Sequence, residues 1–275
     1  MIAVKKTVSS LLPGPHKQFE SEVYHLMMLK HPNIVRCVGY CYETRNECLE
    51  YNGSYVFAEK AERLLCLEYL SNGSLDKYLS DESSGLDWST CYNIIKEICH
   101  GLSHLHEQID KPIIHLDLKP ANILLDDTLV PKITDFGMSR LFSQQQTICT
   151  SPCVGTFGYM APEFLHGGII TPKLDIFNLG VIIMEIITGH RDYPSISGTT
   201  SDDFIEHALE KWRNVLKRSP RYESLEADCH QIKRCIQVGL ICVNPDRTKR
   251  PPIAKIINMI LGSENIDCNI NEEAA

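Results

Sequence analysis

Three short motifs in the middle of this 275-residue chain constrain its fold more than any other feature of the sequence. Residues 115–122 read His-Leu-Asp-Leu-Lys-Pro-Ala-Asn, residues 135–137 read Asp-Phe-Gly and residues 161–163 read Ala-Pro-Glu. The second motif starts 13 positions after the first ends, and the third ends 28 positions after the second starts. Either tripeptide alone arises often by chance, but coincidence does not account for all three in this order and at these spacings.

With these motifs the chain resembles the protein kinase family over residues 2–262. The resemblance implies an α+β protein with the two-lobed protein kinase fold. In this fold a small N-terminal lobe has a sheet and one helix, and a larger C-terminal lobe is mainly helical. The N-terminal lobe is expected at residues 1–70, the C-terminal lobe at 71–262 and a polar tail at 263–275. ATP and Mg²⁺ are the cofactors that the resemblance implies.

Transfer of a γ-phosphoryl group requires a metal ion that binds the phosphates, a cation beside the developing charge and an aligned hydroxyl group. The motifs contain a candidate residue for each of these requirements. Asp135 and Asn122 carry the hard oxygen atoms that Mg²⁺ prefers, and they are the expected metal ligands. Asp117 is expected to accept or orient the proton of the substrate hydroxyl. Lys119 is expected to neutralise charge on the moving phosphate, so that Asp117, Lys119 and Asn122 form the predicted catalytic set.

The N-terminus supplies residues for binding the nucleotide. Lys5 follows Ala3-Val4, as in the Val-Ala-Ile-Lys of the family, and is expected to bind the α and β phosphates. Glu22 lies seventeen residues later on a predicted helix and is expected to form an ion pair with Lys5. Glu20 is the competing choice, but it lies about 200° around the helix from Glu22, which is favoured.

The site for the adenine ring is placed by the resemblance alone. Ala3 is expected to touch the ring, and the backbone of Glu68 and Leu70 to meet its polar edge. Leu67 is expected to be the gatekeeper.

Two further features indicate which branch of the family the chain resembles. Lys119 is typical of the serine/threonine branch, and Thr156 resembles the hydroxyl that bonds the Asp117 and Lys119 pair there. Asn-Gly-Ser-Leu at 72–75 and Glu-Ile-Ile-Thr-Gly at 185–189 look like the plant receptor-like kinase group.

Supporting residues are expected around these motifs. Asp175 resembles the Asp that holds the backbone of the catalytic loop, and His115 is expected to anchor that loop and Phe136. Arg250 resembles the buried Arg that pairs with Glu163.

The hydrophobic pattern predicts the main elements. Strands are expected at 2–5, 34–41 and 64–69. The polar segment between the last two is expected to be a loop, with a hairpin inside it as the alternative. A helix before His31 is expected to bury Phe19, Val23, Leu26 and Met27. Further helices are expected from Trp88 and over 175–187, 204–217, 226–243 and 252–262.

The chain departs from the family pattern in two places. Only four residues precede Lys5, so the Gly-rich loop and its two strands are absent, and about three strands with an exposed edge are expected. Either the sequence is a fragment or truncated gene model of a longer kinase, which is favoured, or the product folds without that lid. Leu116 replaces the usual Arg, so phosphorylation of the following segment is not expected to activate the protein through that Arg. The residues concerned are Thr147, Thr150, Ser151 and Thr156.

The composition excludes some partners. A net charge of −8 argues against a nucleic acid partner. The most apolar stretch, 179–188, is too short to span a bilayer, and the N-terminus lacks the pattern of a secretory signal. A cytoplasmic location is therefore expected, which includes the cytoplasmic part of a plasma-membrane receptor.

The function predicted from the sequence is ATP-dependent phosphorylation of serine and threonine hydroxyls of proteins, by the cytoplasmic kinase domain of a receptor-like kinase. The alternative is a non-catalytic, kinase-like scaffold or binding module, because the nucleotide lid is absent. A small-molecule phosphotransferase is a weaker third interpretation. Lys5, Asp117, Asn122 and Asp135 are all retained, which favours the catalytic interpretation. The sequence does not identify the substrate or the oligomeric state.

Overall fold

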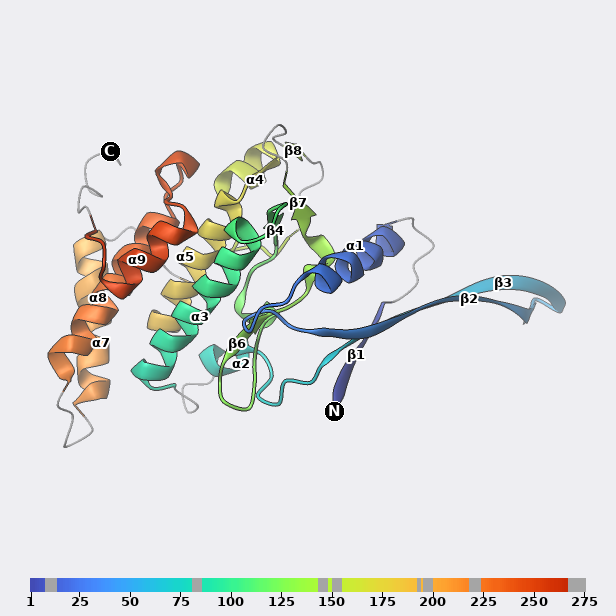
Figure 1. Ribbon diagram of the computed structural model, residues 1–275, viewed down its shortest axis with the longest axis horizontal. Coiled ribbons are helices and arrows are strands. Elements are labelled where there is room, and N and C mark those ends of the chain that lie inside the picture. The colour runs from blue at the N-terminus through green and yellow to red at the C-terminus, as the bar shows by residue number, and fades with distance from the viewer. Residues whose placement is uncertain are drawn as a thin grey trace.

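A three-stranded antiparallel sheet and helix α1 (Gly14–Met28) form one end of the molecule, and helices form most of the rest (Figure 1). The structure is a computed structural model, and it describes residues 1–7, 14–80, 86–142, 148–149, 155–191, 194, 200–217 and 224–266. Its strands are β1 (Ile2–Thr7), β2 (Cys37–Tyr51), β3 (Ser54–Glu68), β4 (Ile113–Ile114), β5 (Ile123–Leu125), β6 (Pro131–Ile133), β7 (Arg140–Leu141), β8 (Ile148–Cys149) and β9 (Ile169–Ile170). Its other helices are α2 (Leu75–Ser80), α3 (Trp88–Glu107), α4 (Pro162–Gly167), α5 (Lys173–Thr188), α7 (Ser201–Leu216), α8 (Leu225–Cys242) and α9 (Ile253–Leu261), with 3₁₀ turns η1 (Pro120–Asn122), η2 (Phe136–Met138) and η3 (Arg247–Lys249).

The small sheet has the strand order β1-β3-β2, and its three strands agree with the prediction. Helix α1 buries Phe19, Val23 and Leu26, as its periodicity predicts. Met27 is 60% exposed, so its predicted place in the core is wrong. The cause is that Met27 lies about 100° around the helix from Leu26 and points away from the buried side.

A long hairpin of β2 and β3 projects from the body of the molecule (Figure 1). The predicted segment between two short strands is a hairpin and not a loop, because the pairing continues without interruption from Cys41 opposite Leu64 to Tyr51 opposite Ser54. The alternative that this segment contains a hairpin agrees with the structure, but the strands are longer than expected. Asn52 and its neighbour Gly53 close the hairpin with positive φ angles of 50° and 76°, the geometry of a two-residue turn of type I′. Among the described residues, the outer part of this ribbon pairs only with itself, and it carries exposed aromatic side chains, which are Tyr51, Tyr55 and Phe57.

The core of the helical part is built around α5, whose residues are buried nearly all round, as predicted. Helices α5 and α8 approach closely at Gly180, where a Cβ atom would lie 2.7 Å from Cβ of Cys242 and 2.9 Å from the carbonyl oxygen of Gly239. Helix α3 begins as predicted at Trp88, because the Asp87 carboxylate accepts the N–H of Thr90 at 2.7 Å and caps the first turn. Within the described residues, no helix combines the length and the apolar character needed to span a membrane.

Two short strands, β5 and β6, lie between the first and the second motif of the sequence. They pair antiparallel from Ile123 opposite Ile133 to Leu125 opposite Pro131. The loop before β5 and the loop after β6 therefore lie next to each other. A further pair of hydrogen bonds ties this hairpin to the segment that follows α1, because Val35 N–H donates to the Ile133 carbonyl and Ile133 N–H to the Asn33 carbonyl.

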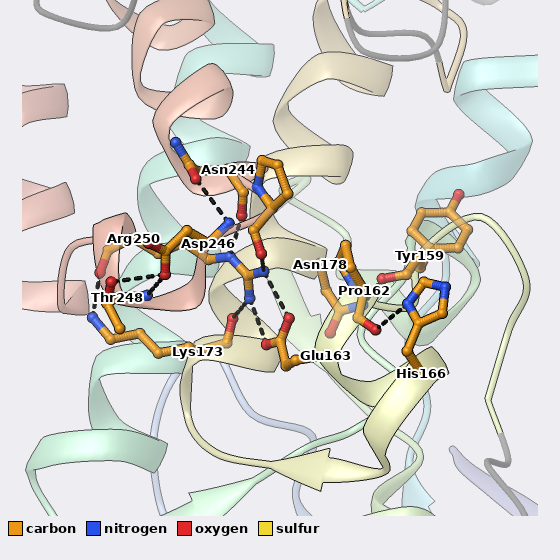
Figure 2. Close-up of polar contacts among 11 residues, drawn as sticks. Tyr159, Pro162, Glu163, His166, Lys173, Asn178, Asn244, Asp246, Thr248 and Arg250 are labelled. Carbon is orange, nitrogen blue, oxygen red and sulfur yellow. Dashed lines mark hydrogen bonds and ion pairs between the residues drawn. The ribbon is translucent and has the colours of Figure 1, made fainter. Parts of the chain in front are cut away.

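An ion pair joins α4 to the segment between η3 and α9 (Figure 2). The buried guanidinium of Arg250 donates to both oxygens of Glu163, at 2.7 and 2.8 Å. The predicted pairing of these two residues is present in the structure. The Arg250 guanidinium also donates to the backbone carbonyls of Asn244, Lys173 and Pro245, so all five of its N–H groups have acceptors.

Candidate active site

Strand β1, helix α1 and the loop after β6 each place one charged residue at a common point. Lys5 Nζ lies 2.8 and 3.0 Å from the two carboxylate oxygens of Glu22 and 2.7 Å from Oδ1 of Asp135. Glu20, the competing partner, instead accepts a hydrogen bond from the hydroxyl of Tyr42 on β2 at 2.6 Å. The structure therefore brings Glu22 to Lys5 and leaves Glu20 on another side of the helix.

Burial and the neighbouring opposite charges shift the pKa values of Lys5, Glu22 and Asp135 in opposite directions. Burial raises the pKa of Glu22, whose side chain is 4% exposed, and the positive charge of Lys5 opposes part of that rise. Burial alone lowers the pKa of Lys5, but Glu22 and Asp135 together bring it above its usual value. Burial alone raises the pKa of Asp135, and the hydrogen bond and charge of Lys5 bring it below its usual value. The Asp135 carboxylate is thereby held in the charged form.

The loop between β4 and β5 gathers the second group of polar residues. The carboxylate of Asp117 accepts hydrogen bonds from Lys119 Nζ at 2.7 Å and from the Thr156 hydroxyl at 2.7 Å. Lys119 Nζ also donates to the Thr156 hydroxyl oxygen at 2.6 Å. The Asn122 amide nitrogen donates to the backbone carbonyl of Asp117 at 2.8 Å and to its carboxylate at 3.1 Å. These four residues form one hydrogen-bonded network.

The backbone of this loop is fixed by Asp175, which is fully buried on α5. Its two oxygens accept the backbone N–H groups of His115 and Leu116, at 2.8 and 3.0 Å, and its Oδ2 also lies 2.8 Å from Nε2 of His106. The expected role of Asp175 in holding this backbone corresponds to these contacts. The φ angle of 70° at Leu116, rare for a residue with a Cβ, is stabilised by these bonds.

Asp135 follows β6 in a left-handed conformation with φ 65° and ψ 66°. This turn directs its carboxylate to Lys5 and sends Phe136 into the core, where its ring meets that of His115 edge-on at 5.0 Å. His115 Nε2 lies 2.9 Å from the Thr134 carbonyl oxygen, so the expected anchoring of both loops by His115 is seen. Thr134 N–H also donates to the Asn122 carbonyl at 2.9 Å, which places the Asn122 and Asp135 loops side by side.

The donor set at these loops fits Mg²⁺. The Asn122 nitrogen is used by Asp117, which leaves the amide oxygen for a cation, and Asp135 has a second carboxylate oxygen beyond the one that binds Lys5. The described residues contain no group of three or more His, Cys, Asp or Glu side chains arranged for a metal. Few protein ligands suit Mg²⁺, which keeps waters or phosphate oxygens in its shell.

The residues expected around adenine are not part of either network. Ala3 pairs with Leu67 across β1 and β3. Glu68 ends β3, and its carboxylate accepts the backbone N–H of Arg36 and forms an ion pair with Lys132 at 3.2 Å. Leu70, just beyond β3, is buried.

A pocket of about 560 Å³ opens beside Lys119 and Thr156, and the sequence analysis did not assign it. Asp76 on α2 and Glu185 near the end of α5 contribute acidic side chains to its lining. The hydroxyl of Tyr159 donates a short hydrogen bond to Glu185. Glu185 stands in the Glu-Ile-Ile-Thr-Gly segment noted in the sequence, but nothing local links it or Asp76 to this pocket, because both join it only through the fold.

Of the four residues considered for phosphorylation, only Thr156 lies in the described part of the chain. Its hydroxyl is occupied by Asp117 and Lys119. Thr147, Thr150 and Ser151 lie outside the described residues.

The family is established by comparison with known proteins. A model of the protein kinase domain matches residues 1–260 of this chain. The chain belongs to the protein kinase domain family, and the prediction of an α+β protein kinase fold is confirmed.

Curated relatives show which members of the family this chain is similar to. The G-type lectin S-receptor-like serine/threonine-protein kinase SD1-13 of Arabidopsis thaliana is 38% identical over 269 residues, which are 96% of this chain and 30% of the relative. The cysteine-rich receptor-like protein kinase 44 of the same plant is 36% identical over 269 residues, 94% of this chain and 66% of the relative. The predicted resemblance to plant receptor-like serine/threonine kinases is confirmed. The chain spans about 30% of the length of SD1-13 and of the S-receptor-like kinase SRK of Arabidopsis thaliana.

Proposed function

We propose that this chain transfers the γ-phosphoryl group of ATP to serine and threonine hydroxyls of proteins. The observation that carries the proposal is the network in which Asp117 is bound by Lys119, Thr156 and Asn122. It sets a carboxylate, a cation and a side-chain amide around one point, which matches the requirements of phosphoryl transfer. In this proposal Asp117 accepts or orients the hydroxyl proton, and Lys119 stabilises charge on the phosphoryl group.

The nucleotide is assigned to the second group of charges. Lys5, held by Glu22, binds the α and β phosphates, and Asn122 and Asp135 hold Mg²⁺. Bound Mg²⁺ neutralises phosphate charge during the transfer. The lowered pKa of the Asp135 carboxyl supports this assignment, because a charged carboxylate is the form that binds a cation.

The adenine ring is assigned to the start of β1 and the end of β3. Ala3 lies beneath the ring, and backbone groups of Glu68 and Leu70 meet its polar edge. Support comes from the pairing of β1 with β3, which sets Ala3 opposite Leu67 and next to this segment.

The biological setting is proposed from the names of the relatives. We assign the chain to the cytoplasmic part of a receptor-like kinase, with lobes at residues 1–70 and 71–262. The names of the relatives support the serine/threonine class, and the Lys119 to Thr156 contact accords with it. The non-catalytic alternative has no observation in its favour.

The test is transfer of labelled phosphate from ATP and Mg²⁺ to a generic basic protein, followed by identification of the labelled amino acid. Asp117→Asn should lower the rate by at least about 100-fold, since it removes the proton acceptor. Asp127→Asn is the matched control, because Asp127 is an exposed residue of the β5–β6 turn, and its rate should equal that of the wild type.

Label on phosphoserine or phosphothreonine that disappears in Asp117→Asn supports the proposal. Full activity of Asp117→Asn, label confined to phosphotyrosine, or a wild-type chain that binds Mg-ATP without transferring phosphate contradicts it.

A further inference from the structure

One side of α1 lies directly on the turn that follows Asp135. A Cβ atom at Gly137 would lie 3.0 Å from the amide nitrogen of Gln18, so the helix and the turn are in close contact there. One turn further along α1, the Ser21 hydroxyl donates to the backbone carbonyl of Ser139 at 3.5 Å. A further turn along, Nδ1 of His25 lies 2.6 Å from the Ser139 hydroxyl. The contact therefore extends over two turns of the helix.

The contact between His25 and Ser139 is buried, since each residue is only 3% exposed. The Ser139 hydroxyl donates its single proton to the carbonyl of Phe136, at 2.6 Å. That carbonyl accepts only, so Nδ1 of His25 carries the hydrogen that joins it to Ser139. The chain of bonds runs from α1 through His25 and Ser139 to the residue that follows Asp135.

His25 and Glu22 are three residues apart on α1, which places them about 60° apart around the helix and within one turn. A rotation or outward shift of α1 that takes Glu22 from Lys5 must therefore also break the bond from His25 to Ser139. Breaking it leaves the buried imidazole of His25 without the Ser139 oxygen that accepts its proton, which is unfavourable.

We propose that His25 and Ser139 are positioning residues that lock α1 to the turn after Asp135 and so keep Glu22 on Lys5. This inference rests on the proposed function, because the pair acts through the nucleotide-binding residues and not on the reacting atoms. The bond from His25 to Ser139 couples the position of α1 to the conformation of the Asp135 turn, next to the longer contact from Ser21, and loss of either partner weakens this coupling.

The experiment compares Ser139→Ala, His25→Leu and His25→Asn with the wild type. Asn places an amide N–H near the position of the imidazole Nδ1–H, whereas Leu keeps bulk without a donor. Ser103→Ala is the matched control, because Ser103 is a buried serine on α3 away from the site. Hydrogen exchange of residues 18–28 and kcat/KM for ATP are measured for each variant.

Ser139→Ala and His25→Leu should each speed exchange in α1 by about tenfold, which corresponds to about 1.4 kcal/mol. Exchange in α5 should stay unchanged. Each variant should also lower kcat/KM for ATP by at least about threefold, as the population with Glu22 on Lys5 falls. The double variant should be no worse than either single one, and His25→Asn should restore most of both properties.

Equal α1 exchange in the wild type, Ser139→Ala and His25→Leu overturns the proposal, as does a His25→Asn variant no better than His25→Leu. Ser139→Ala removes only one oxygen atom, so it tests the inference even if His25→Leu does not fold. The exchange result needs no phosphate transfer, and it therefore separates failure of this inference from failure of the proposed function.

Discussion

Replacement of Glu163 by Gln should strongly destabilise the fold, because it removes the charge that opposes the buried Arg250. The side chain of Arg250 is fully buried, and its guanidinium carries a positive charge. Glu163 supplies two of its five acceptors and all of the opposing charge within hydrogen-bond distance (Figure 2). In Glu163→Gln the amide oxygen can accept from one nitrogen of Arg250, while the amide NH₂ group faces the other nitrogen as a second donor.

The magnitude follows from this geometry. The guanidinium keeps three backbone carbonyls, but it becomes an uncompensated buried cation, and such a loss costs about 3 to 5 kcal/mol. A total unfolding free energy of about 5 to 15 kcal/mol is usual, so the variant loses a large part of its stability. At about 2 to 4 °C per kcal/mol for a chain of this size, Tm should fall by about 6 to 20 °C.

Urea unfolding, followed by the fluorescence of Trp88 and Trp212, measures this change. Both indoles are buried in the helical part, with ring centres 5.4 Å apart, so their emission reports on the part of the fold that the ion pair joins. Glu206→Gln is the control, because Glu206 and Arg213 form an exposed pair at 3.8 Å worth about 0 to 1 kcal/mol.

Loss of less than about 1 kcal/mol in Glu163→Gln, similar to Glu206→Gln, would refute the reasoning about burial. The double variant Glu163→Leu with Arg250→Met should be more stable than Glu163→Gln, since apolar pairs often replace buried ion pairs at little cost.

Three further perturbations have expected outcomes. Lys5→Met should lower kcat by at least about 100-fold and change ATP affinity far less, which steady-state kinetics and nucleotide titration check. Burial lowers the pKa of His25 from 6.5 to about 4, so the stability this group contributes is complete above pH 6.5 and is lost as pH falls toward 4. Between pH 7 and 5 the wild type should therefore lose about 2 kcal/mol that His25→Asn does not lose, measured by urea unfolding at both values. Replacement of residues 45–60 by Asn-Gly, which joins the opposed residues Thr44 and Ala61, should change Tm by less than about 3 °C, because in the described part of the chain these residues pair only with each other. A larger fall in Tm would show that the ribbon stabilises the body of the protein.

The parts of the fold that the sequence predicted well are those with local signals. Helix α5 is apolar on nearly every side, and α3 begins directly after the capping residue Asp87. Both patterns can be read from a short stretch of the sequence. The motif residues lie near one another in the structure because the short strands β5 and β6 hold them on adjacent loops. Arg250 and Glu163 were paired by resemblance, and no spacing rule would have joined residues 87 positions apart.

The errors have physical causes that a window of sequence does not contain. The segment between Glu43 and Glu62 is rich in charge, which suggested a loop, but each residue up to the turn at Asn52 and Gly53 pairs with one on the opposite strand. His25 carried no signal as a neighbour of Ser139, because 114 residues separate them and only the packing of α1 brings them together.

Leu116 shows how the catalytic loop keeps its shape without the Arg that the family usually has there. The backbone N–H of Leu116 is held by Oδ1 of Asp175, and that of His115 by Oδ2 of the same residue. Both bonds come from the main chain, so they are independent of the side chain at position 116. Asp175 is itself fixed by the burial of α5 and by the contact of its Oδ2 with His106. The geometry of the loop around Asp117 is thus set by the helical core, and none of these bonds requires a phosphate group to form.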